Sequence, residues 1–123
     1  MSTVLVIEDD AATLRVIEGY LKRAGYRVRA AASGADGIAL AQAGGIDLVT
    51  LDVRMRPIDG WAVFERLRAD PATRNIPVVF VTVVEHAIVG RSLGAEGYVG
   101  KPFRGQQLVE VVARALREAS ARA

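Results

Sequence analysis

Residues 46–52 read Ile-Asp-Leu-Val-Thr-Leu-Asp, a short apolar run that ends in an acid. The runs Val4–Ile7 and Val78–Val81 have the same continuous Val, Ile and Leu character. Such runs predict strands that are buried on both faces, as in a parallel sheet. Helical patterns lie between them, and this alternation predicts parallel strands joined by crossover helices. The stretch and its two counterparts therefore predict an α/β fold.

Working outward from residues 46–52, the pattern divides the whole chain into five β/α units. We expect strands over about residues 3–8, 27–31, 46–51, 78–81 and 96–100. We expect helices over about residues 11–24, 34–43, 60–70, 85–93 and 105–119. A doubly wound five-stranded sheet of order 2-1-3-4-5 places the first and third strands side by side at its switch point.

Charged and hydroxyl side chains follow four of these strands at their carboxyl ends: Glu8, Asp9, Asp52, Thr82 and Lys101. Ligand groups of open α/β sheets gather at this edge. Two carboxylates about 4 Å apart repel by roughly 4 kcal/mol at an effective dielectric constant near 20. A cation or a proton must therefore neutralise the cluster, and oxygen ligands select a hard ion such as Mg²⁺. An aspartate in such a site can attack phosphorus, while a lysine and a hydroxyl contact the phosphate oxygens.

The composition is that of one globular domain. The chain has 123 residues, of which 51% are hydrophobic, so disorder is not expected. No apolar run approaches the roughly 20 residues of a membrane span. With no cysteine, the sequence has neither a disulfide framework nor a thiolate metal site. We expect a soluble, cytoplasmic protein with no membrane partner.

Basic residues slightly outnumber acidic ones, 16 to 14, which gives a formal charge of +2. Nearly all of the basic residues are arginines, and the sequence pI is about 9.4. A high pI can indicate a nucleic-acid partner. However, the arginines are spread along the chain, and no segment combines a basic run with stacking aromatic residues. We therefore expect no direct nucleic-acid binding by this chain.

Five segments together resemble the successive motifs of response-regulator receiver domains of two-component signalling: VLVIEDD (4–10), LVTLDVRM (48–55), IDGW (58–61), VVFVT (78–82) and LGAEGYVGKPF (93–103). The match covers essentially the whole chain, so residues 1–123 are expected to form one receiver domain. The resemblance implies a flavodoxin-like (βα)5 fold. It also implies that Asp52 accepts a phosphoryl group from a sensor histidine kinase or a histidine phosphotransfer protein.

The resemblance also implies a metal site. Asp9 would bind Mg²⁺ directly, Glu8 would act mostly through water, and the backbone carbonyl of Arg54 would complete the protein ligands together with Asp52. The domain would promote its own phosphorylation and dephosphorylation without being an enzyme that acts on a separate substrate. Phosphorylation would control a downstream protein effector.

For the other site residues, the resemblance implies that Lys101 pairs with the phosphoryl group and that Thr82 donates its hydroxyl to it. Asp52, Lys101 and Thr82 would therefore be the catalytic set. Thr82 and Tyr98 match the hydroxyl and aromatic positions that reorient when a receiver switches. The Lys101–Pro102 bond is expected to be cis.

Several residues depart from the family pattern. Arg56 stands before Pro57, where family members usually have proline directly after the methionine, and Val83 is bulkier than the usual residue after the switch threonine. A degenerate receiver that no longer accepts phosphate is therefore an alternative. The interval from Thr82 to Gly94 is about one helical turn shorter than in many transcriptional receivers. In this it resembles receivers found alone or fused to sensor kinases.

Other interpretations of the same residues stay open at this stage. An aspartate-nucleophile phosphatase also uses a lysine and Mg²⁺, but its nucleophile ends the first strand, whereas Asp52 follows the third. Asp10 and Asp59 each precede a helix and are expected to be N-caps. Glu8 could be a solvated acid at a strand end, and Tyr98 could be a core residue.

Overall fold

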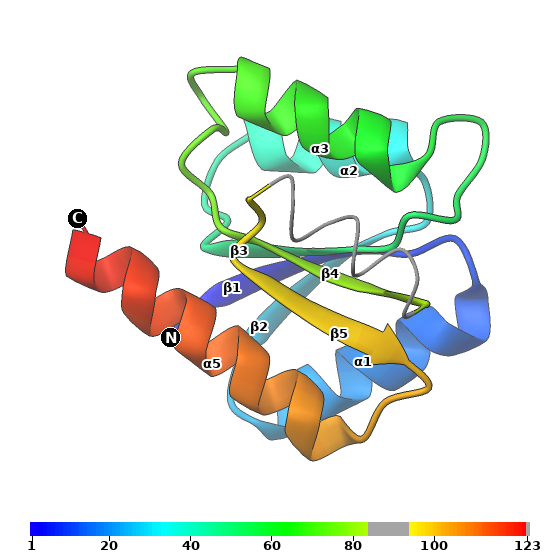
Figure 1. Cartoon of the computed structure of the whole chain (residues 1–123), viewed down its shortest axis with the longest axis vertical. Coiled ribbons are helices and arrows are strands. Elements are labelled where there is room, and N and C mark those ends of the chain that lie inside the picture. The colour runs from blue at the N-terminus through cyan, green and yellow to red at the C-terminus, as the bar shows by residue number, and fades with distance from the viewer. Residues whose placement is uncertain (84–93, 123) are drawn as a thin grey trace.

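The chain alternates strands and helices along its length, as the computed structural model shows for residues 1–83 and 94–122 (Figure 1). The elements are β1 (Thr3–Ile7), α1 (Ala11–Arg23), β2 (Arg27–Ala31), α2 (Gly34–Gln42), β3 (Leu48–Leu51), α3 (Gly60–Ala69), β4 (Val78–Val83), β5 (Gly97–Lys101) and α5 (Gly105–Arg122). The helix expected over residues 85–93 lies outside the described residues.

The strands form one parallel sheet of order β2-β1-β3-β4-β5, which confirms the predicted doubly wound α/β fold. β1 and β3 are neighbours, and Ile7 is in register with Leu51. The backbone N–H of Asp52 donates to the carbonyl of Ile7 over 3.2 Å. The residues that follow these two strands therefore leave the sheet next to each other.

Helices cover both faces of the sheet (Figure 1). Successive strand residues point to opposite faces, so Val4 and Val6 pack in the cluster under α1 and α5, and Leu5 and Ile7 in the cluster under α2 and α3. At Gly37 of α2 a Cβ atom would lie 2.4 Å from Ile7 Cδ1, so only glycine allows this close approach. Two apolar layers thus fix the strand ends that carry the site.

The observed elements differ from the expected ones mainly at their ends. β3 begins at Leu48, two residues later than expected, and the carboxylate of the preceding Asp47 accepts the backbone N–H of Thr3 over 2.8 Å. β4 continues to Val83, so Thr82 lies within the strand and not after it. α5 extends to Arg122, three residues beyond its expected end.

The predicted N-caps of two helices are confirmed. The side chain of Asp10 accepts from the N–H of Thr13 at the start of α1, and Asp59 accepts from Ala62 at the start of α3. Within residues 1–83 and 94–122, none of the helices has both the length and the apolar character that crossing a membrane requires.

Candidate functional site

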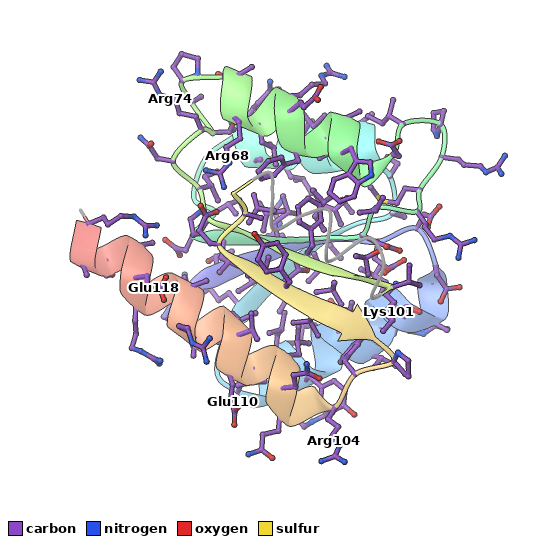
Figure 2. The ribbon with its side chains drawn as sticks, viewed as in Figure 1. Arg68, Arg74, Lys101, Arg104, Glu110 and Glu118 are labelled. Carbon is purple, nitrogen blue, oxygen red and sulfur yellow. The ribbon has the colours of Figure 1, made fainter. Side chains whose placement is uncertain are left out.

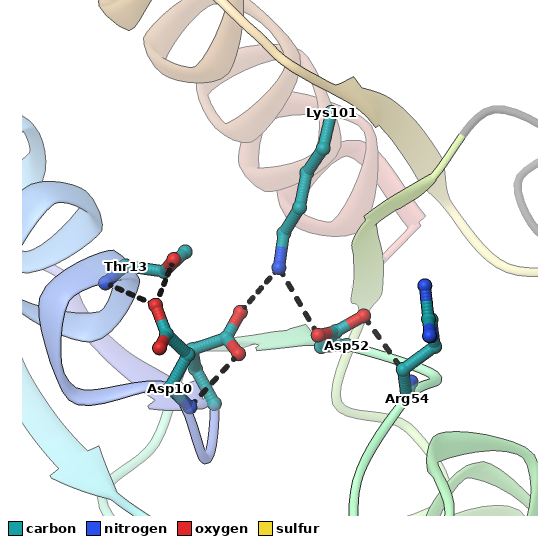
Figure 3. Close-up of polar contacts among 6 residues, drawn as sticks. Asp10, Thr13, Asp52, Arg54 and Lys101 are labelled. Atoms are coloured by element: carbon teal, nitrogen blue, oxygen red, sulfur yellow. Dashed lines mark hydrogen bonds and ion pairs between the residues drawn. The ribbon is translucent and has the colours of Figure 1, made fainter.

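The carboxyl ends of β1, β3 and β5 bring two acids and a lysine into contact. The ammonium of Lys101 donates to Glu8 Oε1 over 2.7 Å and to Asp52 Oδ2 over 3.0 Å (Figure 3). The side chains of Glu8 and Asp52 are almost fully buried, whereas Lys101 is about one-fifth exposed. The predicted cluster of Glu8, Asp52 and Lys101 therefore exists, with Lys101 as the last residue of β5.

Backbone groups hold the remaining carboxylate oxygens. Glu8 Oε2 accepts the N–H of Asp10 over 3.2 Å, and Asp52 Oδ1 accepts the N–H of Arg54 over 3.3 Å (Figure 3). The start of α3 packs against this loop at Gly60, where a Cβ atom would lie 2.2 Å from the carbonyl oxygen of Asp52. The orientation of Asp52 is thus fixed from both sides before any ligand binds.

The cluster carries an excess of negative charge. Carboxylate oxygens of Glu8, Asp9 and Asp52 lie within 4.8 Å of one another, and Asp9 is exposed to solvent. Lys101 is the only cation that bonds to them in the described part of the chain. A donor set of carboxylate oxygens with surplus negative charge suits a hard divalent cation, so the residues present fit Mg²⁺.

The pKa values of Glu8 and Lys101 are both raised above their ordinary values. Burial, together with the charge of Asp52, raises the pKa of Glu8 from 4.5 to about 7, although Lys101 lowers it in part. Burial lowers the pKa of Lys101, but its hydrogen bonds to Glu8 and Asp52 outweigh this and raise that pKa overall. Lys101 therefore stays charged, and Glu8 keeps its proton to a higher pH than an ordinary glutamate does, because its pKa is raised.

The two predicted switch residues lie on neighbouring strands. Thr82 of β4 is fully buried, and its hydroxyl has no hydrogen-bond partner among the described residues. Tyr98 of β5 is partly buried against the α2/α3 cluster, and its hydroxyl donates to the carbonyl of Ala95 over 2.9 Å. Asp10 is the N-cap of α1 and not part of the acidic cluster. Its carboxylate accepts hydrogen bonds from Thr13, and these lower the pKa of Asp10.

Some features of the site were not predicted. A cavity of about 450 Å³ beside Asp9 is lined by both Arg54 and Arg56, and by Trp61, whose ring packs 5.0 Å from that of Phe80. The Lys101–Pro102 bond is cis, as predicted, and the Arg56–Pro57 bond is also cis.

Comparison with known proteins identifies the family. Residues 4–113 match the response regulator receiver domain, so the chain belongs to this family. It is 37% identical to the DNA-binding dual master transcriptional regulator RpaA of Synechocystis over 95% of the chain and 50% of that protein. It is 38% identical to the transcriptional regulatory protein AfsQ1 of Streptomyces coelicolor over 95% of the chain and 52% of that protein.

A solved structure agrees with this assignment. The chemotaxis response regulator CheY4 of Vibrio cholerae superimposes with a TM-score of 0.85 at 28% identity, over 94% of this chain and 98% of that one. The chain is thus a receiver domain with a phosphoacceptor signalling role, and the phosphatase interpretation is wrong. It spans about half the length of the curated relatives it matches.

The comparison corrects the prediction about partners. We expected no direct nucleic-acid binding by this chain. The curated relatives are instead named as transcriptional regulators, and RpaA as DNA-binding. The prediction failed because it rested on the spacing of arginines within a receiver segment, which carries no information about the other half of such a regulator.

Proposed function

We propose that this receiver domain accepts a phosphoryl group on Asp52 from a histidine kinase or histidine phosphotransfer protein, in a Mg²⁺-dependent reaction. The observation that carries the proposal is the Lys101 ammonium shared between Asp52 and Glu8, with the Asp9 carboxylate within reach of both acids. This site has the nucleophile, the cation for phosphate oxygens and the spare oxygen ligands that phosphoryl transfer needs.

The acids have different roles in this proposal. Asp9 is exposed and would hold Mg²⁺ together with Asp52 and the backbone carbonyl of Arg54, while Glu8 would act through water. When bound, Mg²⁺ would supply positive charge for the phosphate oxygens. Glu8 also holds the Lys101 ammonium beside Asp52, so that it is in position when the phosphoryl group arrives.

Residues of this chain supply the nucleophile and orient the phosphoryl group. A carboxylate oxygen of Asp52 forms the new bond to phosphorus, and the phosphorus–nitrogen bond of the phosphohistidine breaks with its electron pair returning to the imidazole. Lys101 then pairs with a phosphate oxygen. Attack of water on the same phosphorus releases inorganic phosphate and regenerates Asp52, so the domain promotes both its phosphorylation and its dephosphorylation.

The switch in this proposal depends on the buried hydroxyl of Thr82. A phosphoryl group adds acceptor oxygens to the site, and the unpartnered Thr82 hydroxyl can donate to one of them. Movement of Thr82 changes the space next to β5, which Tyr98 adjusts to fill. Phosphorylation thereby shifts the population between two existing states. Amide exchange across residues 94–104 should change with a phosphoryl mimic, and identical exchange would contradict the switch.

The curated relatives are longer than this chain and are named transcriptional regulators. Their names support a transcriptional output for longer proteins that contain such a receiver. We propose that residues 1–123 form one receiver domain whose surface contacts a protein effector. Its cytoplasmic location stays a prediction.

Intact-mass measurement after incubation with Mg²⁺ and a small acyl phosphate tests the proposed function. The wild type should gain one phosphoryl group, and Asp52→Asn should gain none. Asp36→Asn is the matched control, because Asp36 is an exposed acid on α2 outside the cluster. A wild-type gain of mass in Asp52→Asn would show that Asp52 is not the acceptor.

A further inference from the structure

A second cavity lies on the other side of the molecule from the phosphoacceptor site. It has a volume of about 480 Å³ and opens next to the amino-terminal ends of β4 and β5. Its lining is almost entirely polar: Arg68, Arg74, Asn75, Glu96, Ala119 and Arg122. Figure 2 shows Arg68 and Arg74 together near the end of α3, far from Lys101.

One of the three arginines in this cavity is already paired. Arg68 forms an ion pair with Glu96, which also accepts the backbone N–H of Val78 over 2.7 Å. The guanidinium of Arg68 stacks 4.9 Å from the centre of the Phe64 ring, so it is held in place. The single carboxylate of the lining is therefore neutralised within the protein.

The other two arginines carry the surplus charge. Arg74 and Arg122 are exposed and form no ion pair with any other described residue. Glu118, one turn before Arg122 on α5, is not among the residues that line the cavity. The cavity thus has two positive charges in excess, carried by guanidinium groups, which bind phosphate oxygens in pairs.

A cavity of about 380 Å³ with a mixed polar and apolar lining adjoins the basic one, and the two share Asn75 and Ala119 in their linings. Its larger apolar side chains are Ile46, Pro71, Ile76, Pro77 and Leu116. Ser2, Asp47 and Ser120 add polar groups to the same lining. A ligand that bridges both cavities would need an anionic group at one end and, at the other, a flat group with polar edges.

We propose that these two cavities form a binding site for a phosphorylated small molecule of the mononucleotide class. The phosphate contacts Arg74 and Arg122, and the base lies among the apolar side chains next to Leu116. Both volumes lie within the range of small-molecule pockets. Two arginines in a hollow are not the extended basic surface that nucleic acid needs.

Calorimetric titration with AMP and CMP, in low salt, tests this site. At least one should saturate with a Kd of about 1 mM or lower, and inorganic phosphate and the unphosphorylated nucleosides should bind more weakly. The double variant Arg74→Ala/Arg122→Ala should lose about tenfold or more in affinity, because it removes charge-assisted hydrogen bonds.

Two control proteins locate the binding. Arg27→Ala/Arg29→Ala removes two exposed arginines of β2 and should bind as the wild type does. Asp52→Asn should also bind normally, because the site is separate from the phosphoacceptor. The proposal is overturned if neither nucleotide saturates, if the Arg74/Arg122 variant binds unchanged, or if the Arg27/Arg29 variant loses as much affinity. It is also overturned if inorganic phosphate binds as tightly as the nucleotides.

Discussion

The two ends of the sheet each contain a largely buried glutamate bonded to a cation, but only one of these glutamates has a cation to itself. At the amino-terminal end of β5, Glu96 pairs with Arg68 and accepts a backbone N–H from Val78. At the carboxyl ends, Glu8 shares Lys101 with Asp52, and Asp9 lies within 4.8 Å. Glu96 is paired with one base of its own, whereas three acids surround one base at the carboxyl ends.

This difference separates a structural ion pair from a functional site. The Arg68–Glu96 pair links α3 to β4 and β5, and nothing further is needed to neutralise it. The carboxyl-end cluster stays short of positive charge in the folded chain, which is why burial and Asp52 together raise the pKa of Glu8 to about 7. A cation relieves that shortage, and a receiver domain can use it for phosphoryl transfer.

Removing the arginine of the balanced pair should give the largest loss of stability. Arg68→Ala leaves the Glu96 carboxylate with only the Val78 N–H and removes the stacking on Phe64, so we expect unfolding to become easier by about 3 kcal/mol. Lys22→Ala is the control, because it breaks the exposed Lys22–Glu18 pair and should cost less than about 0.5 kcal/mol. Equal effects of the two variants in urea denaturation would contradict the comparison.

In the absence of divalent cations, the free energy of unfolding should depend on pH because of the carboxyl-end cluster. The pKa of Glu8 in the folded chain, about 7, lies above its ordinary value of 4.5, so the folded state binds the proton more tightly. This stabilisation is complete below pH 4.5 and is lost as pH rises to 7. We expect a decrease in the free energy of unfolding on the order of 2 kcal/mol over this range.

Glu8→Gln isolates the contribution of this one carboxyl group, because its side chain does not titrate. Urea denaturation at several pH values should give a smaller decrease for the variant than for the wild type. If both proteins have the same pH profile, Glu8 is not the group that takes up the proton.

Two buried threonines allow the same comparison for uncharged groups. We expect their substitution to change the free energy of unfolding less than the variants above. The hydroxyls of Thr50 and Thr82 both lack a partner within the described chain. Thr50 is the penultimate residue of β3, two residues before Asp52. Thr50→Val removes an unsatisfied polar group and should stabilise the fold by about 1 kcal/mol. Thr82→Val should instead impair the response to phosphorylation. A loss of stability in Thr50→Val would mean that its hydroxyl has a partner.

The carboxyl-end cluster could be predicted from sequence because two regularities converge there. Apolar runs mark where β1 and β3 end, and the doubly wound order makes these strands neighbours, so Glu8 and Asp52 had to lie together. Lys101 followed from the resemblance to the receiver family as well as from its place after an apolar stretch. Position along a strand was enough to locate these residues.

The opposite end of the sheet could not be predicted in this way. Arg68 and Glu96 are 28 residues apart, on a helix and a loop, and no periodicity connects them. Residues from the last turns of α3 and α5 line the cavity beside them. The directions of their side chains, and not the positions of strand ends, determine which residues line it. The end of β4 at Val83 was missed for a similar reason, because pairing with Lys101 of β5 extends the strand to that residue.

Calorimetric titration of Mg²⁺ tests the central claim, that the carboxyl-end cluster is short of a cation. Asp9→Asn and Asp10→Asn differ by one position, but only Asp9 belongs to the cluster, and asparagine preserves the α1 cap at position 10. We expect Asp9→Asn to weaken Mg²⁺ binding by about tenfold or more, and Asp10→Asn to bind nearly as the wild type does. Equal affinity in the two variants, or wild-type affinity in Asp9→Asn, would contradict the account.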